Sequence, residues 1–284
     1  MPAAVLGAKA AALGFGLFVH AAYLEYAAHP ADLNPPRSEY PQFPAGYALA
    51  ANLQMSDFIG GSTTPTYYGF IARKLGDPSQ VVVAIRGTDT AEEWWDDFDW
   101  RQAPFSGAPH GGQVAGGFDR IYRSLRLARP GDAGAPLDPS QAGLLPPALG
   151  LDHAASVAVA GHSLGAALAT LYGLGLAAAG QPCAVYTLAS PKVGDQAFSD
   201  AFNAGVAVSV RVYDRPDPVP DFPQNAPPDL YVHVKGGLEV NSLTDLTVRP
   251  DPLCYHSHLT YLYLLGAPRA ILGGPAGCGM PAVP

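Results

Sequence analysis

The chain has 284 residues, a length that suits one large domain or two small ones. Its apolar share of 48% argues against long disordered stretches, and a net charge of −8 without any basic run argues against nucleic-acid binding. Glycine and proline number 32 and 29 and are spread along the chain without a short period. This pattern predicts many tight loops and excludes a fibrous protein.

The N-terminal segment has two interpretations. Residues 10–19 form an uninterrupted apolar run after Lys9, and this run is too short for a membrane span of about 20 apolar residues. Residues 1–22 have the features of a secretory signal segment, with the small residues Ala21 and Ala22 near a cleavage point. The alanine and leucine content favours the other interpretation, a buried first helix. We therefore expect a helix without an integral membrane span, and a compartment that leans towards secretion.

The following segments alternate between strands and helices. A proline-rich stretch over residues 30–66 predicts a wrapping loop, and a Pro/Gly/Ala-rich stretch over 128–151 predicts a surface excursion. The expected strands cover 67–75, 81–87, 156–161, 183–190 and 208–214, and the expected helices cover 118–128 and 164–180. This alternation predicts an α/β fold with a mostly parallel central sheet and helices on both faces. Without an internal repeat or a linker, we expect a single domain over residues 1–284.

The motif Gly161-His162-Ser163-Leu164-Gly165 joins an expected strand to an alanine-rich helix. A G-x-S-x-G sequence in that context is typical of a nucleophile elbow, where the serine occupies a strained turn. Side chains at the two glycine positions would clash in such a turn. The N-terminus of the following helix would direct free N–H groups at the reacting centre. Ser163 is therefore the candidate nucleophile.

A serine nucleophile needs a base, and the base needs an orienting carboxylate. In α/β-hydrolases the chain order is serine, acid, histidine, so both partners should follow Ser163. The candidate acids after the last expected strand are Asp214, Asp217 and Asp221. The candidate bases are His233, His256 and His258. Spacing alone does not choose among them.

Five segments in the same order resemble the class 3 lipase family, the fungal-type triacylglycerol lipases and their bacterial relatives. They are VVVAIRGTDT, AGHSLGAALATL, YTLASPKVGDQAF, RPDPVPDFP and HLTYL. The resemblance covers about residues 67–265 and implies the α/β-hydrolase fold. The sequence also departs from the family pattern at some positions, for example at Ala189, where the family commonly has glycine.

The resemblance implies a role for individual residues. Asp217, which precedes Pro-Val-Pro, matches the acid of the family, and His258, which precedes Leu-Thr-Tyr, matches the base. Thr88 and the backbone N–H of Leu164 match the oxyanion hole, whose donors stabilise the tetrahedral intermediate. His256 is then expected to be structural or to support the base, and His162 to be a packing residue.

The three tryptophans of the chain, Trp94, Trp95 and Trp100, lie within seven residues. In the resembled family a short helical lid follows the Arg-Gly-Thr segment, so Trp94, Trp95 and Phe98 are expected to form a lid or contact the substrate. The alternative is a fixed amphipathic helix, as in an esterase without interfacial activation.

These features predict a serine carboxylester hydrolase that acts through an acyl-enzyme and needs no metal or organic cofactor. The resemblance favours triacylglycerol, presented at an oil–water interface, as the substrate class. The alternatives are a short-chain or feruloyl esterase, a phospholipase A1 and, from another class, a non-catalytic lipid-binding relative. Cys254 and Cys278 could form a disulfide if the protein is secreted, and Cys183 is expected to be a buried free thiol. Oligomeric state is not predicted.

Overall fold

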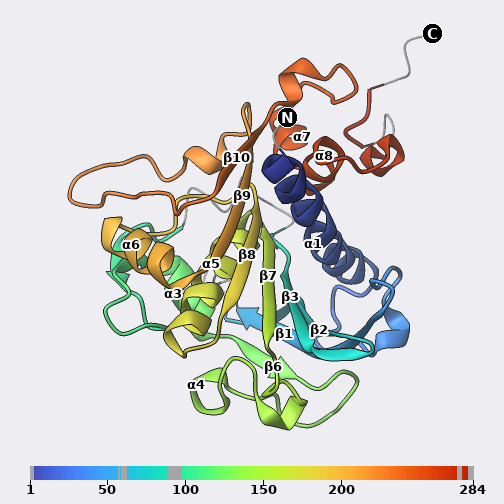
Figure 1. Ribbon diagram of the computed structural model, residues 1–284, viewed down its shortest axis with the longest axis vertical. Coiled ribbons are helices and arrows are strands. Elements are labelled where there is room, and N and C mark those ends of the chain that lie inside the picture. The colour runs from blue at the N-terminus through green and yellow to red at the C-terminus, as the bar shows by residue number, and fades with distance from the viewer. Residues whose placement is uncertain (1–2, 57, 59–62, 89–97, 274–276, 281–284) are drawn as a thin grey trace.

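The computed structural model describes residues 3–56, 58, 63–88, 98–273 and 277–280. Its centre is an eight-stranded sheet in the order β10-β9-β8-β7-β3-β2-β1-β6 (Figure 1). Five neighbouring strands run parallel, namely β3, β7, β8, β9 and β10. Strands β2, β1 and β6 add antiparallel pairings at the other edge. The expected α/β class with a mostly parallel sheet is confirmed.

The strands of this sheet are β1 (Tyr47–Ser56), β2 (Pro65–Lys74), β3 (Asp77–Ile85), β6 (Arg126–Ala128), β7 (Ser156–His162), β8 (Cys183–Leu188), β9 (Val208–Asp214) and β10 (Gly237–Val240). A separate hairpin consists of β4 (Gln102–Pro104) and β5 (Gln113–Ala115). The α-helices are α1 (Ala3–Ala28), α3 (Gly116–Arg123), α4 (Pro139–Ala142), α5 (Leu164–Ala178), α6 (Gln196–Gly205), α7 (Pro252–His256) and α8 (His258–Leu264). Short 3-10 turns are η1 (Arg37–Glu39), η3 (Pro147–Leu149), η4 (Val219–Asp221), η5 (Ser242–Thr244) and η6 (Arg269–Leu272).

Helices cover both faces of the sheet, as the alternating elements predicted. Figure 1 shows α3, α5 and α6 on one side and α1 and α8 on the other. The central strands serve both sides because successive side chains of a strand point to opposite faces. In β3, Val81 and Val83 belong to the core under α5, whereas Val82 and Ala84 belong to the core under α1. This explains the continuously apolar sequence of that strand.

Helix α1 packs on the sheet and contacts β2, β3, β7, β8 and α8. The contact with α8 is close: a Cβ atom at Gly16 would lie 2.7 Å from a methyl carbon of Leu262. The expected N-terminal helix is therefore present and is a layer of the fold. By length and apolar composition alone α1 could also cross a membrane, a test that both core helices and signal sequences pass.

Two expectations about local structure are wrong. Residues 47–56, which were expected to be loop, form strand β1. Its polar side chains Asn52 and Gln54 hid the strand pattern, and both donate hydrogen bonds to carbonyls of the preceding loop, at Pro35 and Leu33. The helix expected over 118–128 ends as α3 at Arg123, because the segment Arg126–Ala128 pairs with β1 as strand β6.

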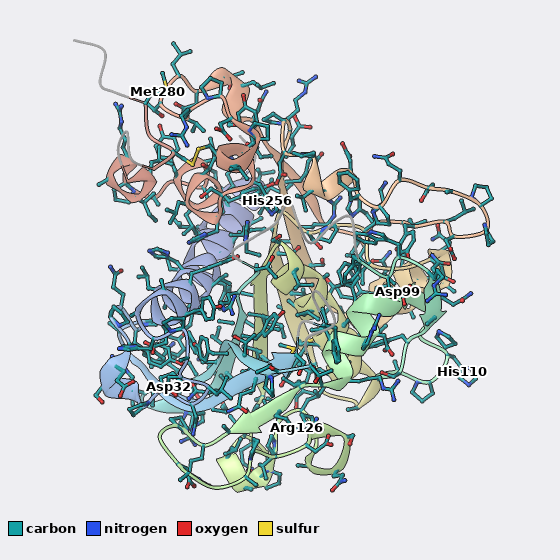
Figure 2. The ribbon with its side chains drawn as sticks, turned by 180° about the vertical axis from the view of Figure 1, so that it is seen from behind. Asp32, Asp99, His110, Arg126, His256 and Met280 are labelled. Atoms are coloured by element: carbon teal, nitrogen blue, oxygen red, sulfur yellow. A yellow bond between two sulfur atoms is a disulfide. The ribbon has the colours of Figure 1, made fainter. Side chains whose placement is uncertain are left out.

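Cys254 and Cys278 form a disulfide, drawn as the yellow bond in Figure 2. It ties α7 to the C-terminal segment. Cys183 is a buried free thiol, as expected, and burial raises its pKa to about 11. A thiol with such a pKa is unreactive at neutral pH.

Candidate active site

Three loops meet at one edge of the sheet, where the parallel strands β3, β7 and β9 end. This edge is where open α/β sheets bind ligands. Ser163 follows β7 directly, Asp217 lies three residues beyond β9, and residues 86–88 follow β3. The chain thus brings the expected nucleophile, the expected acid and the expected oxyanion strand to a common site.

Ser163 occupies a strained turn between β7 and α5. Its backbone has φ 56° and ψ −126°, a region that residues other than glycine rarely adopt. The turn is held by a hydrogen bond from the Ser163 N–H to the Leu188 carbonyl, 3.0 Å long. A Cβ at Gly161 would lie 2.1 Å from the carbonyl oxygen of Gly165, and a Cβ at Gly165 would lie 2.4 Å from that of Arg86. Both glycines are required by close backbone approach, as the elbow motif predicted.

His256 is the histidine that contacts the Ser163 hydroxyl. Its Nε2 lies 2.7 Å from the Ser163 Oγ, and its Nδ1 lies 2.9 Å from the Asp217 Oδ2. All three side chains are buried. Figure 2 labels His256 where the C-terminal helices meet the ends of the strands. The geometry is that of a serine–histidine–aspartate triad, with the base oriented by the acid.

The expectation that His258 contacts Ser163 is wrong. His258 begins helix α8, and its Nε2 lies 3.0 Å from the Nδ1 of His20 in α1. The physical reason is helix geometry: residues i and i+4 share a face, and Leu262, four residues on, packs against Gly16 of α1. His258 therefore faces α1, whereas His256, at the end of the preceding helix α7, faces the nucleophile.

The Asp217 carboxylate accepts hydrogen bonds from several donors. Besides His256, the hydroxyl of Tyr261 donates to Oδ2 at 2.7 Å, and the N–H of Val219 donates to Oδ1 at 3.0 Å. Burial and the neighbouring Asp217 raise the pKa of Tyr261, so its hydroxyl keeps its proton. Sequence reasoning did not assign Tyr261 a role, although it belongs to the HLTYL segment.

Asp214 and His233 bond to residues outside the triad, and Asp221 lies at the surface. The Asp214 carboxylate accepts hydrogen bonds from the N–H and hydroxyl of Ser242, and burial raises its pKa to about 6. Asp221 is exposed. His233 donates from Nε2 to the Pro220 carbonyl at 2.8 Å. These contacts give structural roles to Asp214 and His233.

The end of β3 lies directly against the nucleophile. A Cβ at Gly87 would be 3.0 Å from the Cβ of Ser163, so Thr88 follows at the position expected for an oxyanion-hole residue. Arg86 fixes this strand end: its Nε donates to the Tyr67 carbonyl at 2.8 Å, and its guanidinium lies 3.4 Å from the ring centre of Tyr26. Across from it, Leu164 begins α5, where backbone N–H groups have no partner within the helix.

Most of the segment that was expected to form the lid, including Trp94 and Trp95, lies outside the described residues. Phe98 is described and is half-buried. Its ring packs against Trp100 and Phe118 of α3, with ring centres 4.6 and 4.7 Å apart, respectively. These contacts anchor the end of the segment that was expected to form the lid.

A group of side chains that could hold a metal ion occurs away from this site. Glu25 in the last turn of α1, His29 directly after this helix and Glu39 in η1 place their ligand atoms within 4.8 Å of one another. None of them contacts the triad in the part of the chain that the structure describes. The triad geometry itself contains no metal-ligand set.

Two histidines beside the triad, the buried His162 and the half-buried His258, should make the fold sensitive to acid. Burial lowers the pKa of His258 to about 3 and that of His162 well below its ordinary value of about 6.5. The unfolded chain binds these protons at a higher pH than the folded chain, so the stability from the neutral side chains is complete above pH 6.5 and falls towards pH 3. Each histidine should therefore lower the free energy of unfolding as the pH falls below 6.5.

We expect urea unfolding at pH 7.5 and at pH 5 to show this loss, and the His258→Gln variant to lose less than the wild type. Asp214 acts in the opposite direction, because its raised pKa favours the folded state as the pH falls below about 6. Its contribution cancels in the difference between the two proteins. If His258→Gln and the wild type lose the same free energy of unfolding between pH 7.5 and pH 5, the prediction is contradicted.

Comparison with known proteins identifies the family. The family model for lipase (class 3) matches residues 82–226, half of the chain. A phospholipase A1-II 6 of Oryza sativa subsp. japonica is 29% identical over 249 residues, which are 80% of this chain and 59% of that protein. Phospholipase A1-IIalpha of Arabidopsis thaliana is 27% identical over 66% of this chain and 48% of its own. The chain thus spans about three fifths or less of the length of these curated relatives.

Solved structures share the fold. A lipase from Rhizopus microsporus var. chinensis superposes with a TM-score of 0.59 at 22% identity, covering 85% of this chain and 75% of that one. A Rhizomucor miehei lipase propeptide complex gives a TM-score of 0.60 at 19% identity, covering 95% and 80%.

The fold is that of an α/β-hydrolase. The chain belongs to the class 3 lipase family, as its five motif segments indicated.

Proposed function

We propose that the protein hydrolyses carboxylic esters of acylglycerol lipids through a covalent acyl-enzyme at Ser163, with His256 as the base and Asp217 as the orienting acid. The observation that carries the proposal is the contact of 2.7 Å between the His256 Nε2 and the Ser163 Oγ. This distance lies within the reach of proton transfer between a nucleophile and its base.

The proposed reaction has two halves. In the first, the Ser163 Oγ attacks the ester carbonyl carbon while its proton passes to the His256 Nε2, and the imidazolium then protonates the leaving alcohol. In the second, His256 takes a proton from water, the hydroxide attacks the acyl carbon, and Ser163 recovers its proton as the acid leaves. The N–H groups of Thr88 and Leu164 are the proposed donors to the oxyanion in both halves.

Two substrate classes fit this chemistry. Triacylglycerol is favoured by the motif resemblance and by the cluster of aromatic residues after Thr88. Phospholipid hydrolysis at a single acyl position, the activity named for the curated relatives, is favoured by their sequence similarity to this chain. Both are glycerol esters of long acyl chains, so the same triad serves either substrate.

The Ser163→Ala variant should lose ester hydrolysis by about 10⁴-fold or more in kcat, because it removes the atom that forms the acyl bond. We would measure release of p-nitrophenol from esters of increasing chain length. Emulsified triacylglycerol and phosphatidylcholine vesicles would follow, with the products separated by chromatography. Long-chain activity in one of these two assays assigns the lipid class, and activity confined to short esters indicates an esterase. Activity that survives Ser163→Ala would disprove the proposed nucleophile.

A further inference from the structure

A chain of three hydrogen bonds links α1 to both sides of the triad. The N–H of Gly87 donates to the Tyr23 hydroxyl oxygen at 2.8 Å. The Tyr23 hydroxyl lies 2.8 Å from the His162 Nδ1, and the His162 Nε2 lies 2.8 Å from the backbone carbonyl oxygen of His256. Tyr23 thus connects the strand end beside the oxyanion position with the main chain that carries the base.

The direction of each bond follows from the groups involved. The His256 carbonyl can only accept, so the His162 Nε2 carries the proton and donates it. In neutral imidazole the Nδ1 is then an acceptor, and the Tyr23 O–H donates to it. The Tyr23 oxygen accepts from the Gly87 N–H. One neutral tautomer of His162 satisfies every group, and the burial that lowers its pKa favours this neutral form.

We infer that Tyr23 and His162 are positioning residues for hydrolysis: they hold the His256 main chain and the Gly87–Thr88 strand end at a fixed separation on either side of Ser163. The inference rests on the proposed function, because it names residues that support the same triad. Within the described residues, the bonds of Tyr23 and His162 go to Gly87, to each other and to the His256 carbonyl, so each acts on the proposed reacting atoms through its neighbours.

The position of the base depends on this bond because His256 lies at the junction of two short helices. Helix α7 ends at His256 and α8 begins two residues later, so the backbone there has few partners within a helix. The His162 donor fixes the His256 carbonyl, and His162 is itself adjacent to the nucleophile. A shift of about 1 Å in a reacting group can reduce a rate by about 10²-fold.

The orientation of Tyr23 is supported by α8. Its ring stacks on His258, with ring centres 4.2 Å apart and planes inclined by 8°. His258 in turn contacts His20, one turn before Tyr23 in α1. Helix α1 therefore carries part of the supporting structure of the site, and removal of residues 1–22 as a signal segment would cut the chain next to Tyr23.

The decisive experiment is the Tyr23→Phe variant assayed with a soluble short-chain p-nitrophenyl ester. We expect kcat to fall by about 10- to 100-fold with KM changed less than threefold, since only the positions of the catalytic groups shift. The far-downfield proton resonance of the His256 Nδ1–H should also move or broaden. A merely structural role for Tyr23 would change the melting temperature without these effects.

Tyr40→Phe is the matched control. The Tyr40 hydroxyl is also buried and bonds to Asn52 and Tyr67, but none of these residues contacts the triad among the described residues. Both variants lose one buried hydroxyl, so both should lose stability to a similar degree, and only Tyr23→Phe should lose kcat. If the two variants have the same kcat as the wild type, the inference is overturned.

His162 offers a second test that does not alter α1. His162→Gln keeps an amide donor that can reach the His256 carbonyl, whereas His162→Leu keeps none. We expect the glutamine variant to retain at least threefold more kcat than the leucine variant, and equal kcat in both would contradict the inference. Failure of the proposed function is distinguishable, because the wild type would then show no ester hydrolysis that depends on Ser163.

Discussion

His256→Ala is expected to reduce kcat for ester hydrolysis by about 10⁴-fold or more, because the Ser163 hydroxyl loses its proton acceptor. His258→Ala should reduce kcat by less than about tenfold, since His258 contacts His20 and Tyr23 and makes no hydrogen bond to Ser163. The measurement is kcat and KM of both variants with one soluble ester, beside the wild type and Ser163→Ala.

The two variants are well matched. Both replace one histidine of the same Cys-Tyr-His-Ser-His segment with alanine, and both side chains lie largely within the fold. Circular dichroism and melting temperature would show whether each variant is folded. A greater loss of kcat in folded His258→Ala than in folded His256→Ala would overturn the assignment and restore the base implied by the motif resemblance.

Gly161→Ala is expected to destabilise the protein by more than about 3 kcal/mol, because overpacking against fixed backbone has no rotamer that relieves it. The added Cβ would lie 2.1 Å from the Gly165 carbonyl oxygen and 2.8 Å from the Ala166 nitrogen. Both atoms belong to the first turn of α5, so the clash would push this helix away from β7 and displace Ser163. Urea unfolding of the purified variant, or its failure to accumulate as soluble protein, measures the effect.

The same substitution at Gly14 provides the control. A Cβ at this position would meet no atom within 4 Å. Gly14 is exposed to solvent and lies far from both ends of α1. Alanine there should stabilise the protein by about 0.5–1 kcal/mol, because glycine loses more backbone entropy in a helix. A folded, active Gly161→Ala variant with stability near that of Gly14→Ala would show that the elbow does not need a glycine.

Ala189 shows how a departure from the family pattern is accommodated. It has φ 55°, a conformation that glycine adopts more readily, and the resembled family commonly has glycine at this position. The alanine methyl group is fully buried in the core beneath α1, and burial of this group offsets part of the backbone cost. The sequence showed the departure, but only the backbone angle explains its cost.

Much of the architecture was predictable from local patterns in the sequence. Continuous apolar runs indicated the strands β3 and β7, and the alternation of strands with helices indicated a parallel sheet. The elbow was predictable because a side chain at Gly161 or Gly165 would clash with the backbone next to Ser163, and this requirement is local in the sequence. Asp217, which the family resemblance selected among three aspartates, is the carboxylate that contacts a histidine at the site.

Which of the two histidines meets Ser163 was decided only by the tertiary structure. His256 and His258 are two residues apart and share the same sequence environment, and the motif favoured His258, which bonds to His20, whereas His256 bonds to Ser163. Their directions are set by the boundary between α7 and α8 and by the packing of α8 on α1, neither of which is encoded in the spacing. The contact between Tyr23 and His162 likewise joins residues 139 positions apart, so no local pattern could reveal it. The sequence by itself determined which residue types could perform the chemistry, and long-range packing decided which of them meet.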